Sequence, residues 1–316
     1  FVGLILVNII QPGLGADIAL KIDKIEYQIP EKTIGFNDML VEMVPNNIFG
    51  AMSEGKMLGV IFFSIVFGCA MMVVGKKAEG LVNVVDGLND VMLRITDWIM
   101  KLAPYGVFAL MATLIGRTGL GVFKPLALYM ITVLVGLGLH FAITLCGILF
   151  FVAHYSPIQF ITHMFPALAT AFSTDSSLAT LPVTMECLEK NVGVSNKVIG
   201  FVTPLGATIN MDGTALYEAI AAMFIAQAFG IEMTIMQQIV IFLTATLASI
   251  GAAGIPSAGL ITMVVVLRSV NLPLEGIGLI LAVDRVLDMC RTTVNVFGDS
   301  CGATVIATFE GERLNK

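Results

Sequence analysis

The chain has 316 residues, of which 57% are hydrophobic and only 13% are charged, and its formal net charge is −6. A soluble domain carries about a quarter charged residues, so this composition indicates a polytopic membrane protein. The sequence contains no basic tract, which excludes a typical nucleic-acid-binding surface. The five cysteines are scattered without the spacing of a metal site or a disulfide framework, and we interpret them as small packing residues.

The N-terminal segment begins with an apolar run over residues 1–10, which is too short to span a bilayer because a span needs about 20 residues. It also lacks the basic region of a signal peptide. We therefore expect this run to be the end of a longer helix, with further sequence upstream. A break follows at residues 11–13, and residues 16–32 mix charges with aliphatic residues, which is typical of an exposed loop.

Three longer apolar or amphipathic segments follow. Residues 57–75 form a charge-free run of spanning length. Residues 84–115 have charges at mostly helical spacing, and Pro104 is expected to kink this helix. Residues 125–153 are the most plainly transmembrane stretch. Its lone His140 is interpreted as a packed, hydrogen-bonded side chain rather than a ligand.

The C-terminal half contains apolar segments that are interrupted by small or polar residues, at 173–177, 210–214 and 251–259. The same series of parts occurs twice: a short apolar segment turns and returns, and a longer segment with polar residues follows. Interrupted apolar segments at corresponding positions of two halves indicate a transporter site near the membrane midplane. The alternative is that these interruptions are loops between ordinary short helices.

The segment 284–299 carries most of the candidate chemistry. On a helix, Asp284, Asp288, Arg291 and Asn295 share one face, and Asp299 extends that face by one turn. Among apolar helices such groups face a partner, a cavity or a substrate. The alternative is a soluble helix with an ordinary salt-bridge face.

These residue types match a particular ligand. The guanidinium of Arg291 can bind a carboxylate through two parallel hydrogen bonds, and Asp288 can hold an ammonium. Oxygen atoms of Asn210, Asp212 and Asp299, together with carbonyls freed by the interruptions, suit a hard cation such as sodium. Helix N-termini at the turning points favour an anion. The set predicts a small substrate with two carboxylates and an amine, accompanied by sodium.

Four motifs resemble the glutamate transporter family, a group of dicarboxylate and amino-acid:cation symporters. They are S-S-L-A-T-L-P-V-T at 176–184, N-M-D-G-T at 210–214, I-G-A-A-G-I-P-S-A-G at 250–259 and L-D-M-C-R-T-T-V-N-V-F-G-D at 287–299. The resemblance covers essentially the whole chain and is more specific in its C-terminal half.

The resemblance implies an all-α polytopic membrane protein of the elevator type, with eight transmembrane helices, two re-entrant helical hairpins and inverted repeats. Residues 1–14 would then be the end of the third transmembrane helix, in a transport domain, with the first two helices outside this chain. Residues 15–118 would be scaffold and trimerisation helices with an extracellular loop. Residues 119–316 would complete the transport domain, with hairpins at about 156–189 and 235–270. A homotrimer in the plasma or inner membrane is implied.

The resemblance also assigns roles by position. The implied substrate shell comprises Ser177, Met211, Thr214, Ile255, Gly259, Asp288, Arg291, Thr292 and Asn295. The implied sodium ligands form three sets: Gly206, Asn210, Asn295 and Asp299; Thr208, Ser249, Ile250 and Ala252, mostly through backbone carbonyls; and Asp212 with Asn210, which match part of a third site. Glu218 stands where the excitatory group carries its proton-coupling glutamate, and the alternative for it is a structural carboxylate bonded to a neighbour.

Two positions depart from the family pattern. Members with acidic substrates usually carry a second arginine, at one of two positions that hold Asp175 and Met289 here. A carboxylate at position 175 could weaken the attraction for an anion or titrate itself.

The predicted function is sodium-coupled symport of aspartate or glutamate, with proton coupling as a further hypothesis, and not an enzymatic reaction. A C4-dicarboxylate symporter is the main alternative, although Asp288 would then lack an amine to bind. A neutral amino-acid exchanger is disfavoured by Arg291. An intramembrane aspartyl protease would use Asp212 and Asp299, but its G-x-G-D motif does not match Val296-Phe297-Gly298-Asp299. A ligand-gated anion channel and a non-transporting fragment are further alternatives.

Overall fold

The computed structural model describes residues 1–14, 44–54, 57–102, 105–106, 108–109, 112–113, 116, 121, 123–252, 254 and 256–315. All the secondary-structure elements assigned to these residues are helices, which confirms the expected all-α class for the described part of the chain. The helices separate into two compact units. Unit 1 draws on residues 1–33 and 120–316, and unit 2 on residues 34–119.

Unit 2 contains α4 (Ile48–Glu54), α5 (Met57–Val74), the short 3-10 helix η1 (Gly75–Ala78) and α6 (Glu79–Met100). Helix α5 coincides with the charge-free run predicted to span. Helix α6 begins five residues earlier than predicted, because Glu79 to Asn83 continue the helix directly from η1. It ends at Met100, and residues 101–102 form a turn. Pro104, the predicted kink, lies outside the described residues.

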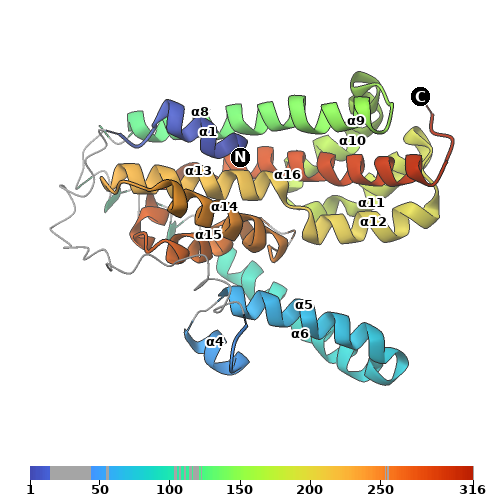
Figure 1. Cartoon of the computed structure of the whole chain (residues 1–316), viewed down its shortest axis with the longest axis horizontal. Coiled ribbons are helices and arrows are strands. Elements are labelled where there is room, and N and C mark those ends of the chain that lie inside the picture. Colours follow the sequence, from blue (N-terminus) through green and yellow to red (C-terminus); the bar gives the residue numbers. More distant parts are fainter. Residues whose placement is uncertain are drawn as a thin grey trace. The chain divides into compact units, whose positions relative to one another are not determined.

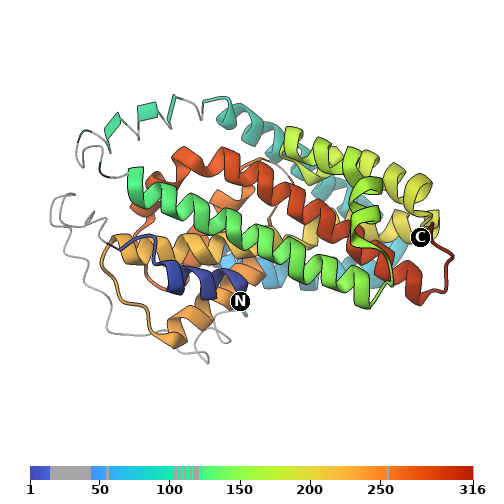
Figure 2. The same ribbon diagram turned by 90° about the horizontal axis from the view of Figure 1, so that it is seen from above.

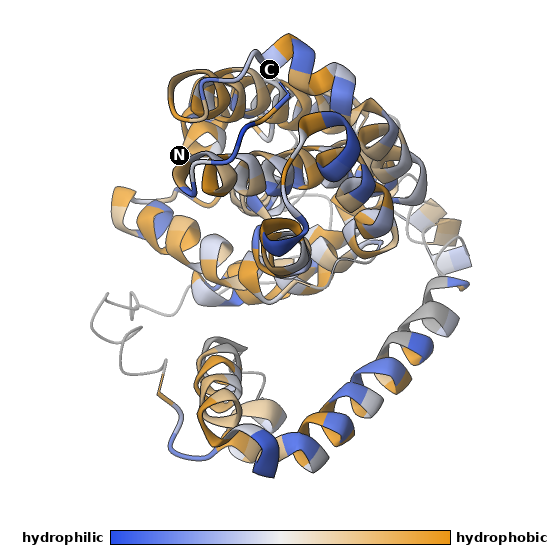
Figure 3. Cartoon of the chain, turned by 90° about the vertical axis from the view of Figure 1, so that its right-hand side faces the viewer, coloured by the Kyte–Doolittle hydropathy of each residue, from blue (hydrophilic) through white to orange (hydrophobic). Residues whose placement is uncertain are grey.

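Unit 1 begins with α1 (Val2–Ile10), which packs against α8 (Phe123–Leu139) and α13 (Asp212–Ala228). Helix α8 runs through a π-helical turn, η3 (His140–Leu145), into α9 (Cys146–Phe151). The combined helix Phe123–Phe151 is long and apolar enough to cross a membrane, whereas the apolar helices α14 (Ile235–Ile250) and α15 (Ala258–Ser269) are shorter. Many large apolar side chains are exposed along the chain, including Phe151 and Phe201. Figure 3 shows hydrophobic residues distributed along the helices.

Two pairs of packed helices form hairpins. The first is α10 (Pro157–Thr174) with α11 (Ser177–Cys187), extended by a π-helical turn, η4 (Leu188–Val192). Helix α10 ends because Asp175 adopts the left-handed conformation, with φ at 56°, which aspartate tolerates better than most residues. The hydroxyl of Ser176 then caps α11 by accepting a hydrogen bond from the Ala179 N–H at 3.1 Å.

The second hairpin is α14 (Ile235–Ile250) with α15 (Ala258–Ser269). A capping box between Thr234 and Gln237 begins α14. The tips of the two hairpins meet: the Ser176 hydroxyl donates to the Gly254 carbonyl at 2.5 Å, and the Leu178 N–H donates to it at 3.3 Å. The polar interruptions predicted from the sequence therefore lie together.

Helix α12 (Asn196–Ile209) and helix α13 are separated by the non-helical residues Asn210 and Met211, as the polar interruption predicted. Helix α16 (Ile277–Phe309) follows the short 3-10 helix η5 (Leu274–Gly276) and packs against α8, α10, α12 and α13 (Figures 1 and 2). It begins seven residues before the charged segment predicted to be helical. Unit 1 is thus organised around α16.

Candidate functional site

A small cavity lies where the two hairpin tips meet the break between α12 and α13 and the middle of α16. Its volume is about 10 Å³, which is enough for roughly one water molecule. Its lining residues are Ser177, Met211, Thr214, Ala252, Gly254, Ala258, Gly259, Asp288, Arg291, Thr292 and Asn295. Both hairpins, α13 and α16 contribute, so the cavity exists only because the interruptions come together.

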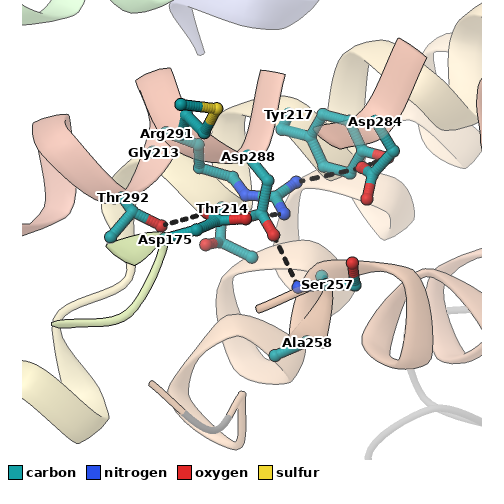
Figure 4. Close-up of polar contacts among 12 residues, drawn as sticks. Asp175, Gly213, Thr214, Tyr217, Ser257, Ala258, Asp284, Asp288, Arg291 and Thr292 are labelled. Carbon is teal, nitrogen blue, oxygen red and sulfur yellow. Dashed lines mark hydrogen bonds and ion pairs between the residues drawn. The ribbon is translucent and has the colours of Figure 1, made fainter. Parts of the chain in front are cut away.

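Arg291 is the central cation of this cavity, and its side chain is 1% exposed. One nitrogen of its guanidinium donates a close hydrogen bond to Asp288, three residues earlier on α16. Another nitrogen, Nη1, lies 3.8 Å from Asp284 Oδ1 without a hydrogen bond. The guanidinium carbon lies 4.2 Å from the centre of the Tyr217 ring, a cation–π contact (Figure 4). A buried N–H without a partner favours an anionic ligand.

Asp288 connects α16 to the second hairpin. While one of its oxygens binds Arg291, the other accepts a hydrogen bond from the backbone N–H of Ser257 at 2.5 Å (Figure 4). Ser257 has a φ of 59° and precedes the first residue of α15. The turn between α14 and α15 is therefore attached to the same carboxylate that binds the arginine.

Two residues of this network were not among the predicted site residues. The Tyr217 hydroxyl donates to Asp284 at 2.7 Å, and both side chains are almost completely buried. Asp284 was placed on the polar face of its helix but received no role. Tyr217 lies one turn after Thr214 on α13, and only the packing of α13 on α16 shows that its ring covers Arg291.

Asp175 lies at the tip of the first hairpin with its side chain buried. Its Oδ1 accepts a hydrogen bond from the Thr292 hydroxyl at 3.2 Å. Its Oδ2 lies 2.8 Å from Nη1 of Arg285, a close ion pair that lacks hydrogen-bond alignment. The side chain of Arg285 is 57% exposed. The carboxylate that replaces an arginine at this position thus has its own guanidinium partner.

The structure brings most of the predicted substrate residues together. The members that line the cavity are Ser177, Met211, Thr214, Gly259, Asp288, Arg291, Thr292 and Asn295. Ile255 lies outside the described residues. Asn295 fixes the start of α13, because its carbonyl oxygen accepts from the Gly213 N–H at 2.8 Å and its amide donates to Thr214 at 3.2 Å.

A second cavity contains most of the first predicted sodium set. Gly206, Asn210 and Asp299 line it together with Asp212 and His140. The Asn210 amide donates to Asp299 at 2.9 Å, so one oxygen of this buried carboxylate has a fixed position. Asn295, by contrast, directs its side chain toward the first cavity.

His140 is hydrogen-bonded, as the sequence predicted, and its partner is Asp212 of the third sodium set. The ring Nε2 lies 2.7 Å from Asp212 Oδ2. His140 begins the π-helical turn η3, and such turns occur frequently at functional sites.

The second predicted sodium set was expected to bind mostly through backbone carbonyls, and three of its members line cavities. Ser249 and Ile250 line a third cavity, which also borders Asn210 and Asp212. Ala252 lines the first cavity, and Thr208 directs its exposed hydroxyl back to its own helix, toward the Leu205 carbonyl at 3.0 Å.

Glu218 is fully buried on α13, one turn beyond Thr214. One of its oxygens accepts a close hydrogen bond from Thr262 of α15, and the other has no hydrogen-bond partner. This arrangement links the second hairpin to α13.

The fold and the site together define a class of protein. Helices that expose apolar side chains and bury a charged cavity between interrupted segments are typical of membrane transport proteins. The model of the sodium:dicarboxylate symporter family matches residues 1–309, and the chain belongs to this family. The resemblance carried by the four motifs is thereby confirmed.

Relatives give a consistent result. The chain is 48% identical to excitatory amino acid transporter 1 of Homo sapiens over 267 residues, which is 84% of this chain and 49% of that protein. It is 46% identical to excitatory amino acid transporter 3 of Mus musculus over 271 residues, 85% of this chain and 52% of that protein. An excitatory amino acid transporter of Caenorhabditis elegans is 46% identical over 253 residues, which is 79% of this chain and 50% of that protein. The chain spans about half the length of these relatives.

Proposed function

We propose that this chain forms the substrate- and ion-binding part of a sodium-coupled symporter of acidic amino acids. The observation that carries this proposal is the buried pair of Arg291 and Asp288, which present opposite charges to one cavity. The family is one of sodium:dicarboxylate symporters, and the relatives named above are excitatory amino acid transporters.

Binding would exchange ion-pair partners inside the cavity. The guanidinium of Arg291 binds the side-chain carboxylate of the substrate, and Asp288 accepts the substrate ammonium. Ser177 and Ala258, the first residues of α11 and α15, line the cavity, so two helix N-termini lie beside it and favour the remaining carboxylate. Every charge of an acidic amino acid then has an opposite charge or a helix N-terminus beside it.

The cavity must enlarge before such a substrate enters. A volume of about 10 Å³ holds about one water molecule, whereas an acidic amino acid is many times larger. The contacts that close it are few: the Gly254 carbonyl binds the first hairpin tip, and Asp288 binds the Ser257 N–H. Separation of the turn between α14 and α15 from these partners opens the site.

Sodium would be bound by oxygen atoms of Asn210, Asp212 and Asp299 beside the second cavity. Asp299 is buried, and a cation offsets the energetic cost of its charge. Glu218 is proposed to carry a co-transported proton, because it is fully buried with one oxygen free of hydrogen bonds.

The finer architecture is also a proposal. Residues 1–14 and 119–316 would form a transport domain that moves as an elevator against a scaffold of residues 15–118, and the two hairpins would be re-entrant. The separation of residues 1–33 and 120–316 from residues 34–119 into two compact units supports this division. A homotrimer in the plasma or inner membrane completes the proposal, and chemical cross-linking in membranes followed by mass measurement tests it.

A C4-dicarboxylate is the second candidate substrate, because the family description names dicarboxylates. Succinate would satisfy Arg291 but would leave Asp288 buried without its guanidinium and without an ammonium to replace it. An unpaired buried charge is strongly unfavourable, so the geometry favours the amino acid.

The test is uptake of labelled L-aspartate into proteoliposomes that contain the complete gene product, driven by an inward sodium gradient. Succinate, L-glutamate and L-serine are the competitors. We expect sodium-dependent uptake that L-glutamate blocks and succinate does not. Arg291→Cys should abolish it, and Arg291→Lys should retain only a weak activity because lysine lacks the two-pronged geometry. Stronger competition by succinate than by L-glutamate would favour a dicarboxylate as the substrate. Stronger competition by L-serine than by L-glutamate would exclude the binding of a side-chain carboxylate by Arg291.

A further inference from the structure

The group that the proposed binding step leaves unused is Asp175 with its partner Arg285. Asp175 comes from the turn between α10 and α11, and its side chain is buried. It touches Thr292, which lines the substrate cavity together with Asp288. Asp175 is therefore in contact with a residue that lines the cavity proposed to bind the substrate.

The charges around the cavity do not balance. We define the Arg291 cluster as Asp175, Asp284, Asp288, Arg285 and Arg291. Three carboxylates and two guanidinium groups give this cluster a formal charge of −1. The imbalance is larger in the interior, because Arg285 is 57% exposed and water screens its charge, whereas the three carboxylates are buried.

This excess negative charge distinguishes between ligands. Succinate brings two negative charges, whereas an acidic amino acid brings two negative charges and one positive charge. The surplus carboxylate attracts the ammonium of an amino acid. A ligand without an ammonium has only carboxylates, which the surplus carboxylate repels. Two unit charges several ångströms apart near a protein surface interact strongly enough to change an affinity by about tenfold or more.

We propose that Asp175 is a specificity-determining residue, which selects ligands that carry an ammonium and rejects dicarboxylates that lack one, while Arg285 holds the Asp175 carboxylate in its buried position. This inference rests on the proposed function and names the chemical class that the site accepts.

Three variants test the charge argument. Asp175→Asn keeps the shape of the side chain and changes the cluster charge from −1 to 0, so the ratio of the half-inhibitory concentration of succinate to that of L-glutamate should fall about tenfold. Arg285→Gln removes a positive charge and changes the cluster charge to −2, so this ratio should rise. The double variant Asp175→Asn/Arg285→Gln restores −1, so its ratio should return toward that of the wild type.

The measurement is the ratio of half-inhibitory concentrations of succinate and L-glutamate against labelled L-aspartate uptake, using the complete gene product. Thermal stabilisation of the purified protein by each acid in sodium gives the same ratio without transport. It also covers a variant that folds but does not transport. If Asp175→Asn does not fold, Arg285→Gln still decides, since a ratio that falls in Arg285→Gln would overturn the charge argument.

The outcomes separate this inference from the proposed function. A ratio that is unchanged in Asp175→Asn, with L-aspartate uptake intact in the wild type, overturns the role of Asp175 and leaves the symporter. A uniform loss of affinity for all acids also overturns it, because a structural role would act in that way. A wild-type protein that neither binds nor transports any of these acids overturns both.

Discussion

Gly259→Ala is a direct test of where the substrate carboxylate binds. A Cβ atom at this position would lie 2.9 Å from the guanidinium carbon of Arg291, 2.9 Å from Nη1 and 3.0 Å from Nη2. Favourable contacts between such atoms occur at about 3.5–4.0 Å, so the guanidinium has to retreat by about 0.6–1 Å. All three atoms belong to the end of a flexible side chain, so the change should displace the guanidinium and leave the backbone in place.

The magnitude follows from the bonds that the guanidinium makes. A hydrogen bond to a charged group contributes about 1.5–3 kcal/mol, and a shift of about 1 Å removes much of this from a ligand carboxylate. We expect a loss of about 1.4–2.8 kcal/mol, which is about 10- to 100-fold in the KM for L-aspartate.

The assay is L-aspartate uptake at saturating sodium, with the melting temperature of the purified protein measured in parallel. Gly200→Ala on α12 is the matched control, because a Cβ there meets nothing within 4 Å and alanine favours a helix. Both variants should keep the wild-type melting temperature in the absence of substrate. An unchanged KM in Gly259→Ala would show that Arg291 does not bind the substrate.

Three further substitutions probe other parts of the site. In Gly206→Ala a Cβ would lie 2.8 Å from Asp299 Oδ1, so the sodium concentration for half-maximal uptake should rise about tenfold at constant maximal rate. A change confined to the affinity for the substrate would contradict the role of Asp299 in binding sodium. Glu218→Gln should make uptake independent of external pH, and a retained pH profile would leave Glu218 a structural residue. In Gly254→Ala a Cβ would clash with the Ser177 hydroxyl, so the free energy of unfolding should fall by about 1–3 kcal/mol. An unaltered melting temperature would argue against contact between the hairpin tips.

Helical periodicity made the charged face of α16 predictable. Spacings of four, three and four residues place Asp284, Asp288, Arg291 and Asn295 on one side, and all four side chains are buried. The interruptions were predictable for a similar reason, because a group of Gly, Pro, Asn, Asp or Ser residues inside an apolar run ends a helix. Asn210 and Met211 separate α12 from α13 where this rule places the break.

Contacts between elements distant in the sequence could not be predicted. The Tyr217 ring covers Arg291, and His140 reaches Asp212 across 72 residues, because whole helices pack against one another. Nothing local in either sequence window specifies that packing. The ion pair of Asp175 with Arg285 could not be predicted for the same reason, since Arg285 lies on α16, 110 residues after Asp175.

The pair of Arg291 and Asp288 has a kinetic and thermodynamic consequence for any ligand. Asp288 is a competing anion that is covalently tethered to the arginine, so its effective concentration around the guanidinium far exceeds that of a free acid in solution. A carboxylate alone must displace this competitor without compensation. An ammonium on the same ligand binds Asp288 as Asp288 separates from Arg291. Competition from Asp288 therefore lowers the affinity of zwitterionic ligands less than that of ligands without an ammonium.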